Sequence, residues 1–231
     1  MFWQVLLGVW MTLVIAGAFL YAPPAEGLGE LSRIAFFHIP VAWVAVLAFL
    51  VAMINSVQYL RRRNLENDLK AATSSELGLA FSILATITGS IFAKSTWGSY
   101  WNWDPRETSI FVLLLIYGAY FALRSAVEGE ERRASLSAVY SIVAFVTVPF
   151  LVFVVPRVYY SLHPDPLVNT RGSLDMEARM LQVFFASLIA FTGLYVWIYR
   201  LQLAIARLGL KMEAPGEAVA GSHSGTHTKK G

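Results

Sequence analysis

Six long runs of apolar residues, none containing a charged side chain, dominate this sequence of 231 residues. They cover residues 1–25, 34–60, 77–93, 108–123, 134–156 and 180–199. A helix needs about 17–25 apolar residues to cross the hydrocarbon core of a bilayer. Because lipid offers no hydrogen-bond partners, the backbone must satisfy its own polar groups, which a helix does within one segment. The runs therefore predict an all-α, polytopic membrane helix bundle with six transmembrane helices.

Details of four runs refine these expected helices. The first run lacks the basic residues that open a signal peptide and exceeds the usual apolar length of about 7–15 residues, so we expect a retained helix. The fourth run is short, but Arg106 and Glu107 can extend it at the headgroup level, where long side chains snorkel. Pro40 should kink the second helix or mark its true start, and Pro149 should kink the fifth.

The distribution of Lys and Arg predicts the orientation. Six helices place both chain ends on one side of the membrane, and that side carries twelve of the 18 basic residues. The other six are Arg33, Lys94, Arg106, Arg157, Arg171 and Arg179. Because basic residues concentrate on the cytoplasmic side, we expect both termini to be cytoplasmic. We divide the chain into a transmembrane domain, residues 1–210, and a disordered cytoplasmic tail, residues 211–231, rich in Gly, Ser, Thr and His.

The remaining composition excludes several classes of protein. The formal net charge is only +3, and no soluble segment has a basic stripe interleaved with aromatic residues, so we expect no nucleic-acid partner. The chain contains no cysteine, which excludes disulfides, thiolate metal sites and thiol–disulfide chemistry by this chain.

The predicted outer loop between the third and fourth helices concentrates aromatic residues. Trp97, Tyr100, Trp101 and Trp103 fall within seven residues. Trp and Tyr collect at membrane interfaces, and an aromatic belt would explain one or two of them. Four on one short loop favour a platform for a flat, amphipathic ligand, since indole rings are broad and carry a polar N–H.

Asp104 follows this aromatic cluster and has a strong structural interpretation. Asp104, Pro105 and Glu107 match an N-cap, a proline at the first helical position and an acidic residue at the third. We expect Asp104 mainly to start the fourth helix, with direct participation in chemistry as the alternative. A cap at this point would fix where the aromatic loop leaves the helix.

Two histidines lie on the same predicted side as the aromatic loop. His38 is at the outer end of the second helix, two residues before a proline, and His163 follows the fifth helix and directly precedes a proline. Haem iron accepts two axial imidazoles, one on each face, so the pair fits a bis-histidine site. A zinc site would need three or four ligands in a spacing that is not present here. His223 and His227, in the tail, are expected to be solvated.

Arginines on the same side are candidates for the two haem propionates, because guanidinium groups pair with carboxylates in bidentate geometry. Arg106, beside the loop, and Arg157, near His163, are our first choices. Headgroup binding is the alternative for each, and it also applies to Arg33, Arg171 and Arg179.

The motif formed by Trp97, Gly98, Trp101, Trp103 and Asp104 resembles the haem-handling superfamily of cytochrome c maturation, which is known for its tryptophan-rich "WWD" loop. Within that superfamily, the length, the six-helix layout and the two histidines resemble the CcmC-type family, from the first helix to Tyr199. Residues 104–108 also resemble the CcsA-type cytochrome c synthases, which are longer and have additional helices and histidines.

The CcmC resemblance implies a haem-binding protein of the bacterial inner membrane with its site on the periplasmic side. It implies haem b as the ligand, His38 and His163 as axial ligands of the iron, and the tryptophan-rich loop as the surface that holds the macrocycle. It further implies delivery of haem to the chaperone CcmE, beside the ABC-type subunits CcmA and CcmB and the small membrane protein CcmD.

Three other functions are alternatives to haem delivery. A CcsA-type synthase would attach haem directly to apocytochrome, and it is the main alternative. A transferase acting on lipid-linked sugars would need a larger outer domain than residues 157–179 provide. A proton-coupled or solute transporter would bury ionisable residues at mid-membrane, whereas the six runs are free of charge.

Overall fold

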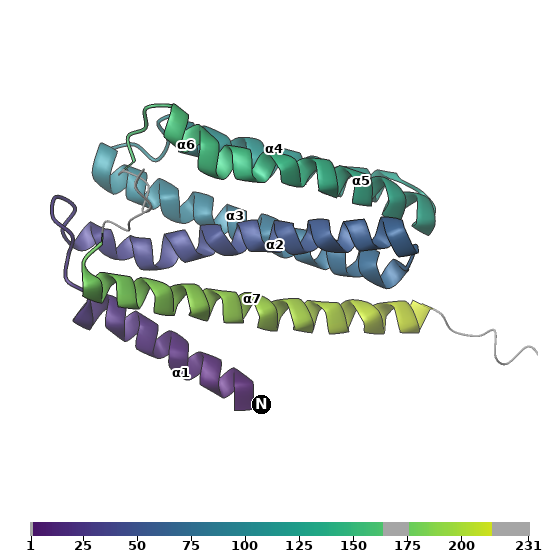
Figure 1. Ribbon diagram of the computed structural model, residues 1–231, viewed down its shortest axis with the longest axis horizontal. Helices are drawn as coiled ribbons and strands as arrows, with labels where there is room; N and C mark the ends of the chain where they lie inside the picture. The colour runs from purple at the N-terminus through teal and green to yellow at the C-terminus, as the bar shows by residue number, and fades with distance from the viewer. Residues whose placement is uncertain (1, 164–175, 214–231) are drawn as a thin grey trace, which may run out of the picture.

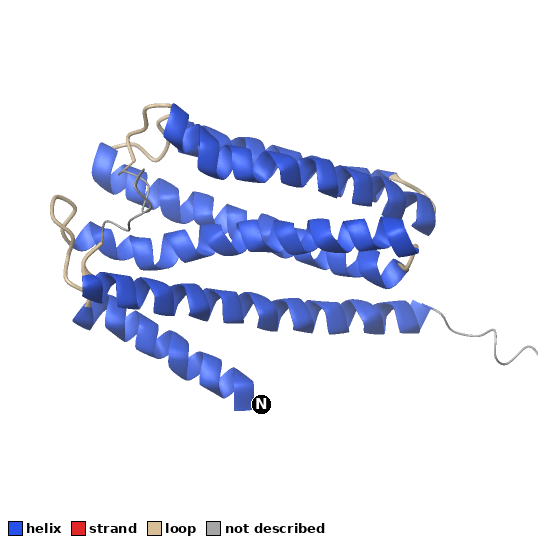
Figure 2. Cartoon of the chain, in the orientation of Figure 1, coloured by secondary structure: helices blue, strands red, loops and turns tan. Residues whose placement is uncertain are grey.

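The computed structural model describes residues 2–163 and 176–213. Six helical segments in this part of the chain are long and apolar enough to cross a membrane. They are Phe2–Tyr21, Glu30–Arg62, Leu65–Trp97, Pro105–Ala126, Glu130–Val158 and Ala178–Gly209. Helices account for nearly all of the described chain, and loops connect them (Figure 2). The predicted all-α bundle of six transmembrane helices is confirmed.

Several of these segments combine more than one kind of helix. The α-helix α1 (Phe2–Ala16) continues as a π-helix, η1 (Gly17–Tyr21). A 3₁₀ turn, η2 (Glu30–Ile34), leads into α2 (Ala35–Arg62). The remaining elements are α3 (Leu65–Trp97), α4 (Pro105–Ala126), α5 (Glu130–Pro149), the π-helix η3 (Phe150–Val154), α6 (Val155–Val158) and α7 (Ala178–Glu213). Of the predicted tail, residues 211–213 belong to α7, and residues 214–231 lie outside the described residues.

The helices are arranged around a central pair. α2 packs along α3, α5 packs on α2, α4 packs on α3 and α5, and α7 contacts both α2 and α3 (Figure 1). α1 touches the bundle through α7 and diverges from it towards the N-terminus. The α1–α2 connection, the α3–α4 loop and the segment after α6 lie together at one end of the bundle. We call this the loop end; the α2–α3 and α4–α5 connections and the end of α7 lie at the opposite end.

The third helix begins at Leu65, whereas the hydropathy pattern predicted a span from Leu77. The predicted start was wrong because the first turns of α3 are polar yet well paired. The Asn64 side chain caps the helix by accepting a hydrogen bond from the backbone N–H of Glu66 at 2.9 Å. Asp68 is buried and forms a bidentate ion pair with Arg124 of α4, at 2.7 and 3.0 Å. The helix therefore includes charged residues before Leu77, where a prediction from apolar residues alone begins the span.

The two expected helix perturbations have different outcomes. Pro40 lies inside α2, which starts at Ala35, so it does not mark the beginning of the helix. Its missing N–H deprives the Phe36 carbonyl of its helical partner, and the Ser187 hydroxyl of α7 donates a hydrogen bond to that carbonyl instead. At Pro149 the fifth helix changes from α-helix to the π-helix η3.

At the centre of the bundle, Phe49 of α2 lies between Tyr117 of α4 and Gly78 of α3. The rings of Phe49 and Tyr117 stack with centroids 3.5 Å apart, and both side chains are fully buried. Phe49 also packs against Gly78 of α3, where an added Cβ atom would lie 2.4 Å from the Phe49 ring. Glycine at this position therefore permits the close approach of α2 and α3.

Candidate functional site

His38 lies in the first turns of α2, at the loop end of the bundle, and its ring faces α3. Its Nδ1 is 2.9 Å from the hydroxyl of Thr88. The hydroxyl donates its one proton to the Leu84 carbonyl at 2.8 Å, and the Ala85 carbonyl is a second neutral partner of the ring. With these partners the imidazole proton is assigned to Nδ1, which leaves the lone pair on Nε2 for a metal.

The backbone of α3 provides the space that the His38 ring occupies. A Cβ atom at Gly89 would lie 3.1 Å from Cε1 of the ring, which is a very tight contact. Gly89 thus leaves room for the His38 ring, and Thr88 contacts its Nδ1. Neither residue stood out in the sequence, because Thr and Gly inside an apolar helix carry no functional pattern.

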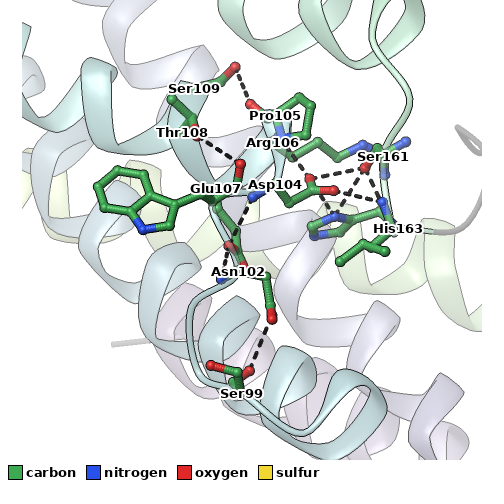
Figure 3. Close-up of polar contacts among 12 residues, drawn as sticks. Ser99, Asn102, Asp104, Pro105, Arg106, Glu107, Thr108, Ser109, Ser161 and His163 are labelled. Atoms are coloured by element: carbon green, nitrogen blue, oxygen red, sulfur yellow. Dashed lines mark hydrogen bonds and ion pairs between the residues drawn. The ribbon is translucent and has the colours of Figure 1, made fainter.

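His163 lies just beyond α6, and the side chain of Asp104 holds it. Its Nδ1 is 2.9 Å from Oδ1 of Asp104 (Figure 3). The ring also packs edge-on against Trp97, with centroids 4.7 Å apart and an angle of 68° between the planes. Residues 164–175 follow immediately, so the predicted loop beyond His163 and the candidate Arg171 lie outside the described residues.

Asp104 has the predicted capping role and in addition contacts the segment that carries His163. It caps α4 by accepting from the backbone N–H of Arg106 at 2.9 Å, and Glu107 completes the expected capping box. The same carboxylate accepts from the Leu162 N–H at 2.7 Å and from the Ser161 hydroxyl at 3.0 Å (Figure 3). Only 1% of its side chain is exposed. One buried carboxylate therefore joins the start of α4 to the segment that carries His163.

The protonation of this pair follows from its surroundings. Burial by itself raises the pKa of Asp104, but hydrogen bonds from the backbone of Arg106 and Leu162 and from the Ser161 hydroxyl lower this pKa below its ordinary value. Burial lowers the pKa of His163, and the negative charge of Asp104 only partly opposes it. At neutral pH Asp104 is therefore ionised and His163 is neutral. An ionised carboxylate can only accept, so Nδ1 of His163 donates and Nε2 retains its lone pair.

Both histidines contact α3 at the loop end of the bundle. His38 contacts this helix at Thr88 and Gly89, and His163 contacts it at Trp97. These contacts are about 12 Å apart along the helix axis, at a rise of about 1.5 Å per residue. The two imidazoles thus lie at the same end of the bundle, and one helix contacts both.

The tryptophans of the loop divide into two groups. Trp97 packs on His163, whereas Trp101 and Trp103 pack edge-on against each other, with centroids 5.8 Å apart, and both pack against Phe111 of α4. Trp103 has a positive φ of 55°, a backbone conformation that costs a non-glycine residue roughly 1–3 kcal/mol. Its side chain is 69% exposed. The exposed indole of Trp103 therefore depends on a strained backbone conformation in the loop.

The candidate arginines have different surroundings. The positive charge of Arg106 acts on His163, which places this guanidinium beside the histidine. Arg157 is exposed and donates to the Phe153 carbonyl at 2.7 Å. Arg33 is held by Glu30 and by the carbonyls of Ala18 and Ala22 at the end of η1. Of these three, Arg33 has the clearest structural role, because it satisfies the carbonyls that end a helix.

The residues present fit a haem better than a free metal ion. Among residues 2–163 and 176–213, no three or more His, Cys, Asp and Glu side chains gather as ion ligands would. Two neutral imidazoles suit the two axial positions of haem iron. An open, mostly apolar cavity of about 300 Å³ lies at the same end of the bundle, between η1, the start of α2 and α3. Neither His38 nor His163 is among the residues that line it, so it is separate from the two imidazoles.

Comparison with known proteins shows the family to which the sequence is related. The sequence matches the family described as heme exporter protein C (CcmC) over residues 1–214. It is similar to the heme exporter protein C of Bradyrhizobium diazoefficiens, with 32% identity over 81% of this chain and 73% of the relative. The corresponding protein of Rhodobacter capsulatus is 29% identical over 74% of this chain and 69% of its own length. A putative cytochrome c biosynthesis ccmC-like mitochondrial protein of Marchantia polymorpha is 26% identical over 88% of both chains.

Proposed function

Because the chain belongs to the heme exporter protein C (CcmC) family, we propose that it binds haem at the loop end of its bundle and delivers it for cytochrome c biogenesis. In this proposal His38 and His163 are the two axial ligands of the iron. The haem is haem b, and it is passed to the chaperone CcmE. CcmA, CcmB and CcmD are the expected partners in the same membrane system.

One observation carries the proposal: both imidazoles are held through Nδ1, so that both present Nε2. Thr88 holds His38 at 2.9 Å, and Asp104 holds His163 at 2.9 Å. Ligating histidines usually donate their other ring N–H to a carboxylate or another oxygen in this way, which fixes the tautomer and the ring orientation. The arrangement prepares two nitrogen lone pairs that need no proton loss before they bind iron.

The residues around the histidines have distinct roles in this proposal. Trp97 supports His163, while Trp101 and Trp103 offer aromatic faces for the porphyrin at the membrane surface. Gly98, with a φ of 80°, ends α3 and lets the chain turn into the loop. Arg106 and Arg157 are the proposed partners of the haem propionates.

Haem binding is tested with the purified protein by absorption and magnetic circular dichroism spectroscopy. The wild type should show a low-spin, six-coordinate haem with two imidazole ligands. His38→Ala and His163→Ala should each give a haem with only one histidine ligand and should reduce cytochrome c assembly in cells. A protein that binds no haem in either oxidation state, or single variants that keep the wild-type spectrum, would contradict the ligand assignment.

The orientation has its own test, which the absence of cysteine makes simple. Ser99 at the loop end and Glu128 at the opposite end are both exposed. In intact spheroplasts, a membrane-impermeant maleimide should label Ser99→Cys and leave Glu128→Cys unlabelled until the membrane is opened. The reverse pattern would place the haem site on the cytoplasmic side.

Delivery is tested by reconstitution with and without the chaperone. Haem-loaded protein should transfer haem to CcmE and should form no thioether bond with apocytochrome when CcmE is omitted. Thioether formation without the chaperone would instead indicate a CcsA-type synthase.

A further inference from the structure

The two histidines are held by chemically different groups. His163 donates to Asp104, an ionised carboxylate with 1% of its side chain exposed. His38 lies against two neutral oxygens, the Thr88 hydroxyl and the Ala85 carbonyl. Nδ1 is 2.9 Å from Asp104 in one histidine and 2.9 Å from Thr88 in the other, so the two sites differ in the charge of the partner.

This difference in charge affects the nitrogen that would bind iron. Hydrogen bonds to an ionised acceptor are roughly twice as strong as those between neutral groups. A carboxylate on Nδ1 also pushes electron density into the ring and makes Nε2 a better donor. A neutral hydroxyl has a much smaller effect. The nitrogen of His163 is therefore the stronger donor of the two.

The contacts of Asp104 also fix the segment that carries His163. Its carboxylate accepts hydrogen bonds from the Ser161 hydroxyl, the Leu162 N–H and the His163 ring.

We propose that the two axial bonds are unequal, so that His163 is the retained ligand of the iron and His38 is the ligand that is lost first. Thr88 is then a positioning residue that sets how readily His38 leaves. The inference rests on the proposed haem site. Loss of His38 to an incoming ligand exchanges one lone-pair donor for another and changes no oxidation state. A site with one strong and one weak bond can hold haem and still give it up in steps.

The test measures the exchange of a histidine for carbon monoxide on the haem-loaded protein reduced with dithionite. At saturating carbon monoxide the observed rate equals the rate at which the weaker histidine leaves the iron. Thr88→Val removes the acceptor for His38 and should raise this limiting rate about fivefold, the effect of one neutral hydrogen bond. Thr88→Ser restores a hydroxyl and should return the rate to the wild-type value. Thr86→Val is the matched control, because the Thr86 hydroxyl bonds the Ser82 carbonyl of its own helix.

A second measurement identifies the ligand that remains. After photolysis of the carbon monoxide complex, resonance Raman spectroscopy reports the iron–histidine stretching frequency. Asp104→Asn should lower this frequency, because the retained His163 loses its anionic partner, and Thr88→Val should leave it unchanged. If Asp104→Asn accelerates exchange while Thr88→Val does not, His163 is the ligand that leaves, and the inference is wrong. A wild type without a bis-imidazole spectrum would instead overturn the proposed ligand pair itself.

Discussion

Replacing Asp104 with asparagine should separate its two roles, helix capping and support of His163. Asparagine caps helices about as well as aspartate, so the hydrogen bond from the Arg106 N–H should persist. The new NH₂ group, however, must take the place of one carboxylate oxygen. Oδ2 accepts from the Leu162 N–H at 2.7 Å, and Oδ1 serves Arg106, Ser161 and His163. With Oδ1 kept, a donor then faces the Leu162 N–H, and His163 loses its ionised partner.

The expected size of the effect follows from these contacts. A buried N–H left without an acceptor costs about 1–3 kcal/mol. Loss of a partner behind a ligating histidine typically weakens metal binding by about 10–100-fold, which corresponds to about 1.4–2.7 kcal/mol. The first cost falls on the folded protein with or without haem, so the second range sets the expected loss of haem affinity in Asp104→Asn, about 10–100-fold. Absorbance titration of the purified variant with haem measures this change, and circular dichroism checks that the helices are retained.

Asn64→Ala provides the matched control. Asn64 caps α3 at the opposite end of the bundle through a single hydrogen bond to the Glu66 N–H. Its loss should cost about 1 kcal/mol of stability and leave the haem affinity unchanged. If Asp104→Asn binds haem within twofold of the wild type, or if Asn64→Ala weakens binding equally, then Asp104 acts only as a helix cap, and our assignment of its second role is refuted.

Two further predictions concern the bundle that supports the site. Gly78→Ala would place a Cβ atom 2.4 Å from the ring of Phe49 and should lower the free energy of unfolding by about 1–3 kcal/mol. Gly118→Ala is the control, because no atom lies within 4 Å of the added Cβ, and it should be neutral or slightly stabilising. Unfolding of both variants in detergent measures the difference. Asp68→Asn would leave Arg124 with a poorly compensated buried charge and should destabilise the folded protein by about 3–5 kcal/mol. The double variant with Arg124→Gln should recover part of this loss of stability, and no recovery would argue against coupling between the two residues.

The sequence predicted those features of the fold that depend on local composition. Apolar run length indicated all six transmembrane helices, and the order of Asp104, Pro105 and Glu107 predicted the capping box that starts α4. The start of α3 was missed because Asp68 is stabilised by Arg124, 56 residues further along the chain. A hydropathy pattern describes one segment at a time, so it does not reveal a charge that is neutralised by another helix.

The same distinction applies to the candidate site. Residue type made His38 and His163 candidates, since few side chains bind haem iron, and their role as ligands stays a prediction. Their partners could not be predicted, because His38 and Thr88 are 50 residues apart and His163 and Asp104 are 59 residues apart. Such pairs depend on the rotation and axial position of each helix, and these follow from close contacts such as that of Gly78 with Phe49.

The hairpin formed by α3 and α4 supports both proposed ligands although it contains neither. Thr88 and Gly89 of α3 hold His38, while Trp97 at the end of α3 and Asp104 at the start of α4 hold His163. The tryptophan-rich loop is the covalent link between these two supports. Its length and backbone conformation therefore affect the relative placement of the two histidines, in addition to any contact that its indoles make with a porphyrin. In the function proposed above, the tryptophans would meet the ligand, and the buried aspartate that ends the loop would position the histidine that binds its iron.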